Sequence, residues 1–396
     1  MSGPTASPDG GVPDLLVLSH LRWSWVWQRP QHLISRFARQ RTTWFLEEPL
    51  VSSDVSEPVL RWHREGPVTV GRLLVPGPER HVGFDSPEAA ALPGLLADVV
   101  SGPVPMAWLY TPLALPIARQ LQPDMLVYDV MDDLASFRGA SVQLRAAQGD
   151  TLEEADIVFA GGRTLHAGVV EHRAGHTHLF PSGVEPEHFA RARQLRSAHS
   201  RPVAGYVGVI DERLDLQLIA DVADELPDWD VRIVGPVAKI DVADLPARPN
   251  LSYPGPVEYR TLPSALAEFD VALMPFALNE ATRSISPTKT LEYFAAGLPV
   301  VSTRVPDVVA DYADVVLLAH DSLSFAHQCR RAVTLARSDE WDRRVAPIVE
   351  RQTWDSIASS MESLVEARWG DLEPSRWRSD SAARSARSAR SARSAR

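Results

Sequence analysis

The segment "SISPTKTLEYFAAGLPVVST", residues 284–303, predicts a helix that runs into a buried strand. Ser286 suits the N-cap of this helix, and Pro287 suits its first position. Gly297 suits the left-handed residue just after the last turn. Apolar residues between them recur at spacings of three and four, and "LPVVST" has the apolar, β-branched character of a strand. The segment therefore predicts a helix from Pro287 to Ala296, followed by a strand.

Lys289 falls in the first turn of this helix, where free backbone N–H groups and the helix dipole already form a positive end. A lysine there is unfavourable unless an anion binds, and helix N-termini are ready phosphate sites. Glu292 lies on the same helix face, and its carboxylate can accept hydrogen bonds from the hydroxyl pair of a ribose. Two interpretations follow: a nucleotide site, or a solvated lysine paired with Glu292.

Short apolar segments alternate with helical stretches along the chain, in two series. This alternation is typical of parallel sheets covered by helices on both faces, and ligands of such sheets bind beyond the carboxyl ends of the strands. We expect an α/β protein with two doubly wound, Rossmann-like domains that face a central cleft. The predicted parts are a flexible leader (1–12), an N-terminal domain (13–184), a linker (185–202), a C-terminal domain (203–350), a helix (351–370) and a disordered Ser-Ala-Arg tail (371–396).

The composition excludes several classes of protein. The 396-residue chain carries a net charge of −11, which disfavours a nucleic-acid binder, and its single cysteine excludes an intrachain disulfide and a thiolate metal cluster. Its start lacks the features of a signal peptide, and no apolar run approaches the roughly 18 residues needed to span a bilayer, so we expect a cytoplasmic protein. Dinucleotide, Walker A and G-x-S-x-G motifs are missing, which disfavours nicotinamide or flavin enzymes, P-loop phosphoryl transfer and serine hydrolases.

Four further motifs narrow the prediction. "FPSGVEPEHF", "YVGVIDERLDLQLI", "WSWVWQRPQHLISRFA" and "YDVMDD" stand in the same chain as the helix segment quoted above. Together they resemble the GT-B glycosyltransferases, in particular the group 4, retaining, nucleotide-sugar family. The resemblance runs over most of residues 12 to 368, and it is strongest to a branch with teichuronic-acid-type and other cell-surface polysaccharide transferases. It implies that the helix at 351–370 crosses back to the N-terminal domain.

The resemblance assigns roles to residues of the donor site. In the family an arginine and a lysine hold the donor diphosphate, and these match Arg213 and Lys289. Glu292 matches the second glutamate of the E-x7-E motif, which binds ribose. Ser284 replaces the first glutamate, so either neighbouring backbone and hydroxyl groups contact the transferred sugar or the donor sugar differs. The expected donor-binding residues are Arg213, Ser284, Ile285, Ser286, Thr288, Lys289 and Glu292.

Asp132 occupies roughly the place where related transferases carry a histidine that touches the donor sugar. A carboxylate there could bind sugar hydroxyls or support positive charge at the anomeric carbon. Alternatively, Asp133 caps the next helix and Asp129 satisfies backbone donors. The spacing does not fit a metal-binding D-x-D motif, so we expect no required metal. We assign catalytic roles to Asp132, Arg213 and Lys289.

Two local alternatives concern other parts of the predicted site. Arg213 could instead pair with a neighbouring aspartate, Asp211 or Asp215. The loop "HLRWSWVWQRPQHL" is expected at the cleft edge, where in this fold it helps to close on the donor phosphate and the acceptor. Its alternating tryptophans could stack on a sugar, contact a membrane surface or pack in the core. The expected acceptor-side residues are His20, Arg22, Trp23, Arg29 and Gln31.

These observations predict a metal-independent glycosyltransferase without a cofactor. It would move a sugar from a nucleoside-diphosphate donor to a saccharide or lipid-linked acceptor, with retention at the anomeric carbon. We expect no nucleic-acid partner, while peripheral contact with the inner face of the membrane stays open. Two alternatives are a GT-B-type nucleotide-sugar epimerase and a catalytically silent nucleotide-sugar-binding protein of a polysaccharide assembly complex. The missing first glutamate motivates the silent protein.

Overall fold

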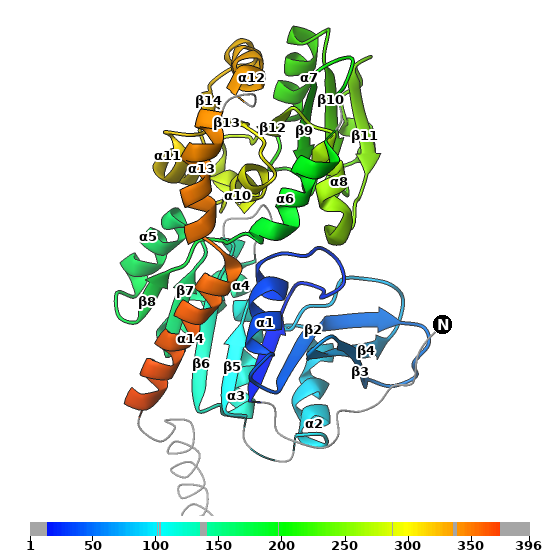
Figure 1. The fold of residues 1–396 in the computed structure, drawn as a ribbon. Helices are drawn as coiled ribbons and strands as arrows, with labels where there is room; N and C mark the ends of the chain where they lie inside the picture. The colour runs from blue at the N-terminus through cyan, green and yellow to red at the C-terminus, as the bar shows by residue number, and fades with distance from the viewer. Residues whose placement is uncertain are drawn as a thin grey trace, which may run out of the picture.

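The computed structural model describes residues 14–372, apart from 101, 103, 135–140, 197, 287 and 336–338. The predicted leader, Pro287 and the predicted tail beyond residue 372 lie outside the described residues. Within the described part the chain forms two α/β domains with mainly parallel sheets, drawn one above the other in Figure 1. The expected fold class is therefore confirmed.

The first sheet belongs to the N-terminal half of the chain and has the strand order β3-β4-β2-β1-β5-β6-β7-β8. All neighbouring strands are parallel except β3 and β4, which are antiparallel. The apolar segments from which the sheets were predicted did not include β3 and β4. The edge strand β3 is mostly exposed, so it lacks the continuous apolar pattern that marks a central strand. The strands are β1 (Leu15–Ser19), β2 (Thr43–Ser52), β3 (Val59–Glu65), β4 (Val68–Pro76), β5 (Met106–Leu109), β6 (Met125–Val130), β7 (Ile157–Ala160) and β8 (Thr177–Leu179).

The second sheet is parallel throughout and has the strand order β11-β10-β9-β12-β13-β14. The predicted series omitted the edge strand β11, which is only partly buried and contains a proline. The strands are β9 (Val203–Val207), β10 (Asp230–Val234), β11 (Leu251–Gly255), β12 (Val271–Met274), β13 (Val300–Thr303) and β14 (Leu317–Ala319).

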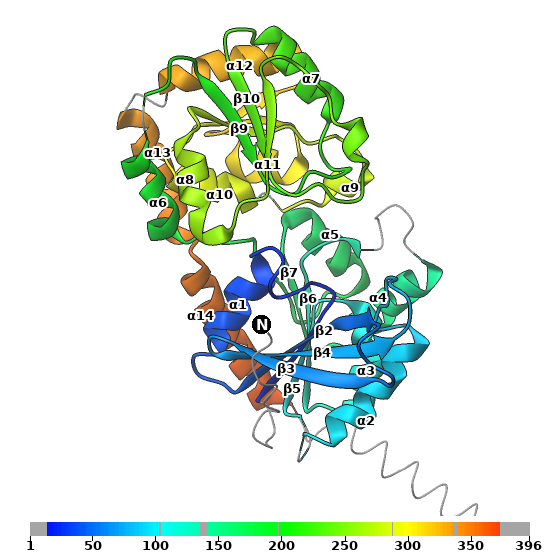
Figure 2. The same cartoon turned by 90° about the vertical axis from the view of Figure 1, so that its right-hand side faces the viewer.

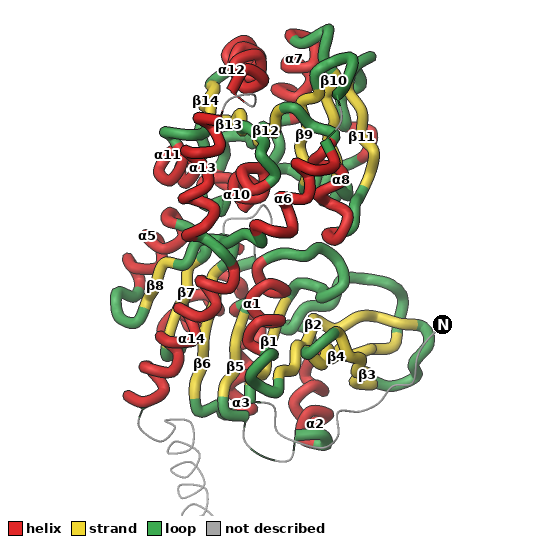
Figure 3. The backbone as a smooth tube through the Cα atoms, viewed as in Figure 1, coloured by secondary structure: helices red, strands yellow, loops and turns green. Residues whose placement is uncertain are grey.

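Helices cover both faces of the sheets, as the tube in Figure 3 shows. Among the described residues, no helix has the length and apolar character that crossing a bilayer requires. The α-helices are α1 (Arg29–Phe37), α2 (Leu92–Ala97), α3 (Leu115–Leu121), α4 (Val142–Glu154), α5 (Arg163–His172), α6 (Pro186–Leu195), α7 (Leu216–Glu225), α8 (Leu262–Ala267), α9 (Glu280–Arg283), α10 (Thr288–Ala295), α11 (Pro306–Tyr312), α12 (Ser322–Leu335), α13 (Asp339–Arg351) and α14 (Trp354–Asp371).

Helix α10 and the strand that follows it form as predicted. Helix α10 begins at Thr288 and ends at Ala295, and the buried strand β13 follows. Gly297 has a φ of +73°, the left-handed conformation that glycine adopts without a steric penalty. Because α10 leads into a central strand of the second sheet, the core fixes the position of its first turn.

Two helices cross between the halves of the chain. Helix α6, within the predicted linker, packs Phe189 and Ala192 into the core of the second domain. Helix α14 returns the chain from the second domain to the first, where it lies beside α1, as Figures 1 and 2 both show. Its residues Trp354, Met361 and Val365 are buried in the core under the first sheet. The N-terminal domain is thus completed by the last described helix. The predicted domain boundaries stay a prediction.

A carboxylate of one domain caps a helix of the other. Helix α5 begins after Gly162, which has no side chain to serve as a cap. Asp307 of α11 replaces it: its carboxylate accepts hydrogen bonds from the backbone N–H of Arg163 (2.8 Å), the backbone N–H of Thr164 (3.1 Å) and the Thr164 hydroxyl (2.5 Å). Asp307 is only 1% exposed, and a side chain at position 162 would lie 2.6 Å from its oxygen. This contact fixes how the domains sit against each other.

Candidate functional site

A cavity of about 150 Å³ lies between the two domains. The N-terminal domain contributes the loop before α1 and the end of β6, and the C-terminal domain contributes the loop after β9 and the first turns of α10. The cavity therefore lies beyond the carboxyl ends of strands, where ligands of doubly wound folds bind. Its lining residues include Trp27, Arg29, His32, Met131, Asp132, Ser182, Tyr206, Arg213, Phe276, Ile285, Ser286, Thr288, Lys289 and Glu292.

A second, more apolar cavity of about 290 Å³ continues from the first. The two cavities share Val26, Trp27, Gly208, Val209 and Lys289. The second is also lined by Tyr259, whose ring centroid lies 5.8 Å from that of Trp27. A charged compartment and an apolar one thus meet at Lys289.

Lys289 meets Glu292 in the structure. Its Nζ lies 3.0 Å from Glu292 Oε2, and the two side chains are 26% and 8% exposed. Both residues line the charged cavity, so both interpretations of the sequence have a structural counterpart: an i,i+3 ion pair, and a cation at a helix N-terminus that faces a cavity.

Arg213 forms a close pair with Asp211. Its Nε lies 3.0 Å from each carboxylate oxygen, and its Nη2 lies 2.7 Å from Oδ2. Burial lowers the pKa of Arg213, but the hydrogen bonds and the charge of Asp211 outweigh this, so its pKa is raised. The alternative of a local aspartate partner is correct as geometry, and Arg213 also lines the cavity. Its role as a phosphate clamp stays a prediction.

Asp129, which lies in β6, and Asp132, which follows that strand, have different surroundings. Asp132 lines the cavity; burial raises its pKa, and the positive charges of Arg213 and Lys239 partly oppose this. Asp129 is fully buried and paired with Arg29, whose Nε lies 3.0 Å from both of its oxygens. Asp129 therefore holds the loop before α1 onto the sheet, whereas Asp132 faces the second domain.

A neighbouring cavity of about 410 Å³ is lined by Asp133 and by Ser284, which stands in place of the family's first glutamate. Ser284 is half-buried just after α9. Ser286 Oγ lies in the charged cavity and donates to Ser182 Oγ at 3.3 Å across the domain boundary. The predicted donor segment 284–288 is therefore shared between two adjoining cavities.

Two of the expected acceptor-side residues, Trp23 and Gln31, are buried, and their contact with an acceptor stays a prediction. Trp23 is 4% exposed and packs edge-on against Phe45, because its large ring is needed to cover one face of the sheet. Gln31 is fully buried, and its amide donates to the carbonyls of Arg22 and Trp23. Both side chains pack in the protein interior and support the backbone around them.

The other three acceptor-side residues lie nearer the cleft. Arg29 lines the charged cavity while it holds Asp129. Arg22 donates to the carbonyl of Pro49 at 2.9 Å and pairs with Glu47. His20 follows β1, and burial lowers its pKa to about 4, so its imidazole is neutral at neutral pH. Their contact with an acceptor stays a prediction.

The list of expected site residues omitted His32 and Tyr259, and it omitted Trp27 although the alternating tryptophans were considered for stacking on a sugar. Trp27 donates through Nε1 to His32 Nδ1 at 3.2 Å, and His32 stacks on Trp354 at a centroid distance of 4.7 Å. Burial lowers the pKa of His32 well below its ordinary value, so this ring is also neutral. The signal was available, since Trp27 and His32 stand in the quoted tryptophan loop, but their contacts with Tyr259 and Trp354 are tertiary.

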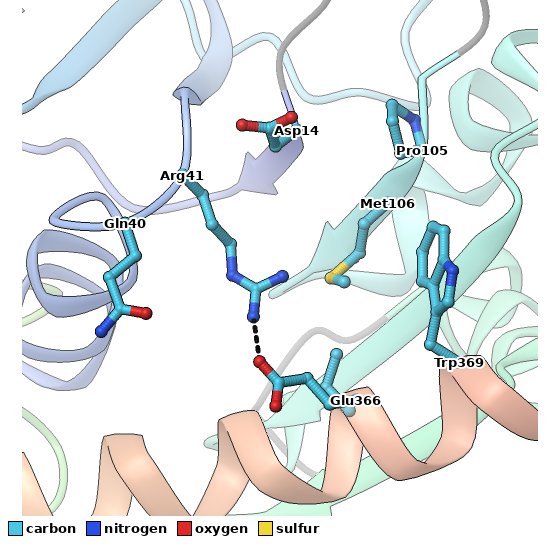
Figure 4. Close-up of a pocket in the computed structure, with 8 residues that line it drawn as sticks. Asp14, Gln40, Arg41, Pro105, Met106, Glu366 and Trp369 are labelled. Atoms are coloured by element: carbon cyan, nitrogen blue, oxygen red, sulfur yellow. Dashed lines mark hydrogen bonds and ion pairs between the residues drawn. The ribbon is translucent and has the colours of Figure 1, made fainter.

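The largest of the described cavities, about 520 Å³, lies elsewhere. Figure 4 shows it between α14 and the amino ends of β1 and β5, with Arg41 donating to Glu366 at 3.3 Å. None of the predicted site residues lines it. In the part of the chain that the structure describes, no group of three or more His, Cys, Asp or Glu side chains could hold a metal ion.

These features define a protein with the GT-B fold, and comparisons with solved structures agree. HepE of Anabaena in complex with UDP-glucose matches 89% of this chain and 99% of its own, with a TM-score of 0.66 and 14% identity. An α,α-trehalose-phosphate synthase (UDP-forming) from Burkholderia xenovorans, in complex with glucose-6-phosphate, matches 88% of this chain and 99% of its own, with a TM-score of 0.64 and 13% identity. At such identities the likeness shows the shared fold.

Sequence comparisons are more specific. Residues 201–334 match the family described as "Glycosyl transferases group 1", so the second domain is a domain of that type. TuaH of Bacillus subtilis (strain 168), provisionally named a teichuronic acid biosynthesis glycosyltransferase, is 24% identical over 259 residues. That match covers 59% of this chain and 65% of the relative's length. The resemblance expected from the sequence is therefore confirmed.

Proposed function

We propose that this chain is a glycosyltransferase that moves a sugar from a nucleoside-diphosphate donor to a saccharide or lipid-linked acceptor, with retention at the anomeric carbon. The main support is the interdomain cavity, which Arg213, Lys289 and Glu292 line together. The names of the matches agree: TuaH is named for teichuronic acid biosynthesis, and the HepE structure holds UDP-glucose. A UDP-sugar donor and a role in cell-surface polysaccharide synthesis follow as parts of the proposal.

The donor would bind with its diphosphate at the first turn of α10. There Lys289 and Arg213 would exchange part of their contact with Glu292 and Asp211 for contact with phosphate oxygens. Glu292, relieved of Lys289, would accept hydrogen bonds from the ribose hydroxyls. The adjoining apolar cavity, with Trp27 and Tyr259, suits a nucleoside base, because flat aromatic walls cover a base at little entropic cost.

In the proposed reaction the bond between the anomeric carbon and the diphosphate oxygen breaks, and the acceptor oxygen bonds to the same face of that carbon. The acceptor proton passes to an oxygen of the leaving diphosphate, so the protein supplies charge and position rather than a nucleophile. Arg213 and Lys289 would stabilise the departing diphosphate. Asp132, on the N-terminal side of the cavity, would bind the sugar or support the charge at the anomeric carbon. Charge supplied by side chains of the protein carries this role, so the proposal includes no metal and no cofactor.

A thermal-shift screen tests the donor part. The melting temperature is measured with UDP, GDP, ADP and dTDP and with their common sugars, for the wild type and for Lys289→Ala. A ligand at 100 times its dissociation constant stabilises the folded state by about 2.7 kcal/mol, which gives a measurable shift. We expect one nucleotide family to stabilise the wild type and the variant to lose most of the shift. No shift with any nucleotide would refute the donor site.

Ser284 in place of a glutamate favours one rival, a silent nucleotide-sugar-binding protein. Incubation of the wild type with the stabilising nucleotide sugar separates the two functions, because retaining transferases without an acceptor release the sugar slowly to water. Free sugar above the level of Lys289→Ala supports the transferase. Binding without any release supports the silent protein. The anomeric configuration of a transferred product, read by NMR, tests retention.

A further inference from the structure

Lysine is nearly absent from this chain: one lysine lines the interdomain cavities, and the other follows Gly235 and Pro236, which line the apolar cavity. Of the 40 basic residues, Lys239 and Lys289 are the two lysines, which leaves 40 − 2 = 38 arginines. Lys289 lines both connected cavities. The charge of Lys239 acts on Asp132 and His20, which both belong to the opposite domain. An ammonium is a compact point charge with rotatable donors, and the rigid fork of an arginine replaces it only in part.

The loop that carries Lys239 is locked to the loop that carries Arg213. Gly235, at the start of this loop, has a φ of +151°, and a Cβ there would lie 1.8 Å from the carbonyl oxygen of Gly208. Glycine alone permits that approach. Beyond it, Ile210 N–H donates to the carbonyl of Pro236 at 2.9 Å, and Ala238 N–H donates to the carbonyl of Ile210 at 3.0 Å. The position of Lys239 is therefore tied to the loop after β9, which contains Arg213.

Lys239 itself has an unusual backbone. Its φ is +62°, one of three positive values at non-glycine residues in the described part of the chain. Such a conformation is disfavoured for a side-chain-bearing residue and persists where the surroundings impose it. Val237 and Ile240 pack against the hydrophobic core on either side, while Lys239 is exposed. The loop is thus anchored by its neighbours and offers a cation at its tip.

The charge balance of the proposed donor site requires a further cation. Lys289 and Glu292 cancel, as do Arg213 and Asp211, which leaves the negative charge of Asp132. His20 and His32 add nothing, because burial lowers the pKa of each ring. A nucleotide-sugar diphosphate brings about two negative charges, and about one more develops as the sugar leaves. An anion of that charge needs more positive charge than this set provides.

We propose that Lys239 is a third cation of the donor site, which contacts the diphosphate of a bound nucleotide sugar and offsets the charge of Asp132. This inference rests on the proposed function and adds a binding residue from the loop after β10. Lys239 reaches the site from the tip of a loop, whereas Lys289 and Arg213 enter it from α10 and from the loop after β9. Residues from three segments of the C-terminal domain would therefore hold the diphosphate, which would face the N-terminal domain.

Binding measurements test this assignment. The dissociation constants of UDP, GDP, ADP and dTDP, and of the parent nucleosides, are measured by calorimetry for the wild type, Lys239→Ala, Lys239→Arg and Lys289→Ala. Arg248→Ala is the matched control, because Arg248 is a partly exposed cation of the same domain that pairs with Asp224. We expect Lys239→Ala to weaken the diphosphate about 10- to 100-fold, the value of a charged hydrogen bond, with little change for the nucleoside. Lys239→Arg should recover part of the loss.

The small number of lysines allows a second readout. Acylation of exposed amines, followed by mass spectrometry, reports on Lys239 and Lys289 separately. The bound diphosphate should slow acylation at both, and the nucleoside should leave Lys239 unprotected. If no nucleotide binds the wild type, the proposed function fails. If a diphosphate binds, Lys289→Ala weakens it and Lys239→Ala behaves like Arg248→Ala with unprotected Lys239, then this inference fails while the proposed function stands.

Discussion

Removal of the Asp307 carboxylate should loosen the contact between the domains. Its two oxygens cap α5 through the backbone N–H groups of Arg163 and Thr164 and through the Thr164 hydroxyl. Gly162 offers no substitute cap. Loss of an N-cap costs about 1 kcal/mol, and loss of a buried negative charge at a helix N-terminus costs about another 1 kcal/mol. We therefore expect Asp307→Ala to destabilise the first turn of α5 by about 2 kcal/mol.

Hydrogen exchange measures this effect directly. A change of about 2 kcal/mol corresponds to about 30-fold faster exchange, because about 1.4 kcal/mol is a factor of ten. The faster exchange should be confined to the amides of Arg163 and Thr164 and their neighbours in α5. Asp307→Asn, which keeps one acceptor oxygen, should give a smaller change.

Asp311→Ala is the matched control for the cap. Asp311 pairs with the side chain of Arg163, which is half-exposed, and such pairs contribute less than about 1 kcal/mol. Equal exchange rates in Asp307→Ala and the wild type would refute the assignment of Asp307 as the cap. Equal effects in Asp307→Ala and Asp311→Ala would show that side-chain pairing, rather than capping, holds the domains.

Three further predictions concern the N-terminal domain. Arg29→Met leaves the carboxylate of Asp129 buried without its partner, so urea unfolding should show a loss of about 3 to 5 kcal/mol, and a loss below about 1 kcal/mol would contradict the structural role of the pair. Burial raises the pKa of Glu48 to about 7, above its ordinary 4.5, so the folded state holds this proton more tightly and stability should fall as pH rises from about 5 to about 7. Glu48→Gln should remove that part of the pH dependence, and an unchanged profile would exclude Glu48 as its source. Trp354→Ala removes a fully buried ring from the core under the first sheet and should cost about 3 to 5 kcal/mol, whereas the exposed Trp369→Ala should cost much less in the same unfolding assay.

Local signals were enough to predict helix α10. Ser286, Gly297 and the apolar spacing between them mark α10 to within a residue or two, and the same helix turn places Lys289 beside Glu292. The pairing of Arg213 with Asp211 was also an available alternative, because the two residues are separated by one position. Contacts of this kind depend on a few dihedral angles, so a sequence pattern can carry them.

Other features depend on tertiary packing and were missed. Trp23 and Gln31 are close to Trp27 in the sequence, and nothing in their spacing shows which of the three is buried and which lines the cavity. The cap of α5 joins residues 144 positions apart. Lys239 is a different case: the scarcity of lysine was visible in the sequence, but its relation to Asp132 appears only once the loop after β10 is placed.

The return of α14 also bears on the order in which the chain acquires its structure. The ribosome synthesises the N-terminal domain first, and domains generally fold as they emerge. Here Trp354, Met361 and Val365, which belong to the core of that first domain, are among the last described residues to be made. Part of the apolar face of the first sheet therefore stays uncovered until the whole second domain has been synthesised. The domain that is synthesised first is therefore completed last, and its uncovered apolar face is the surface that a chaperone would bind.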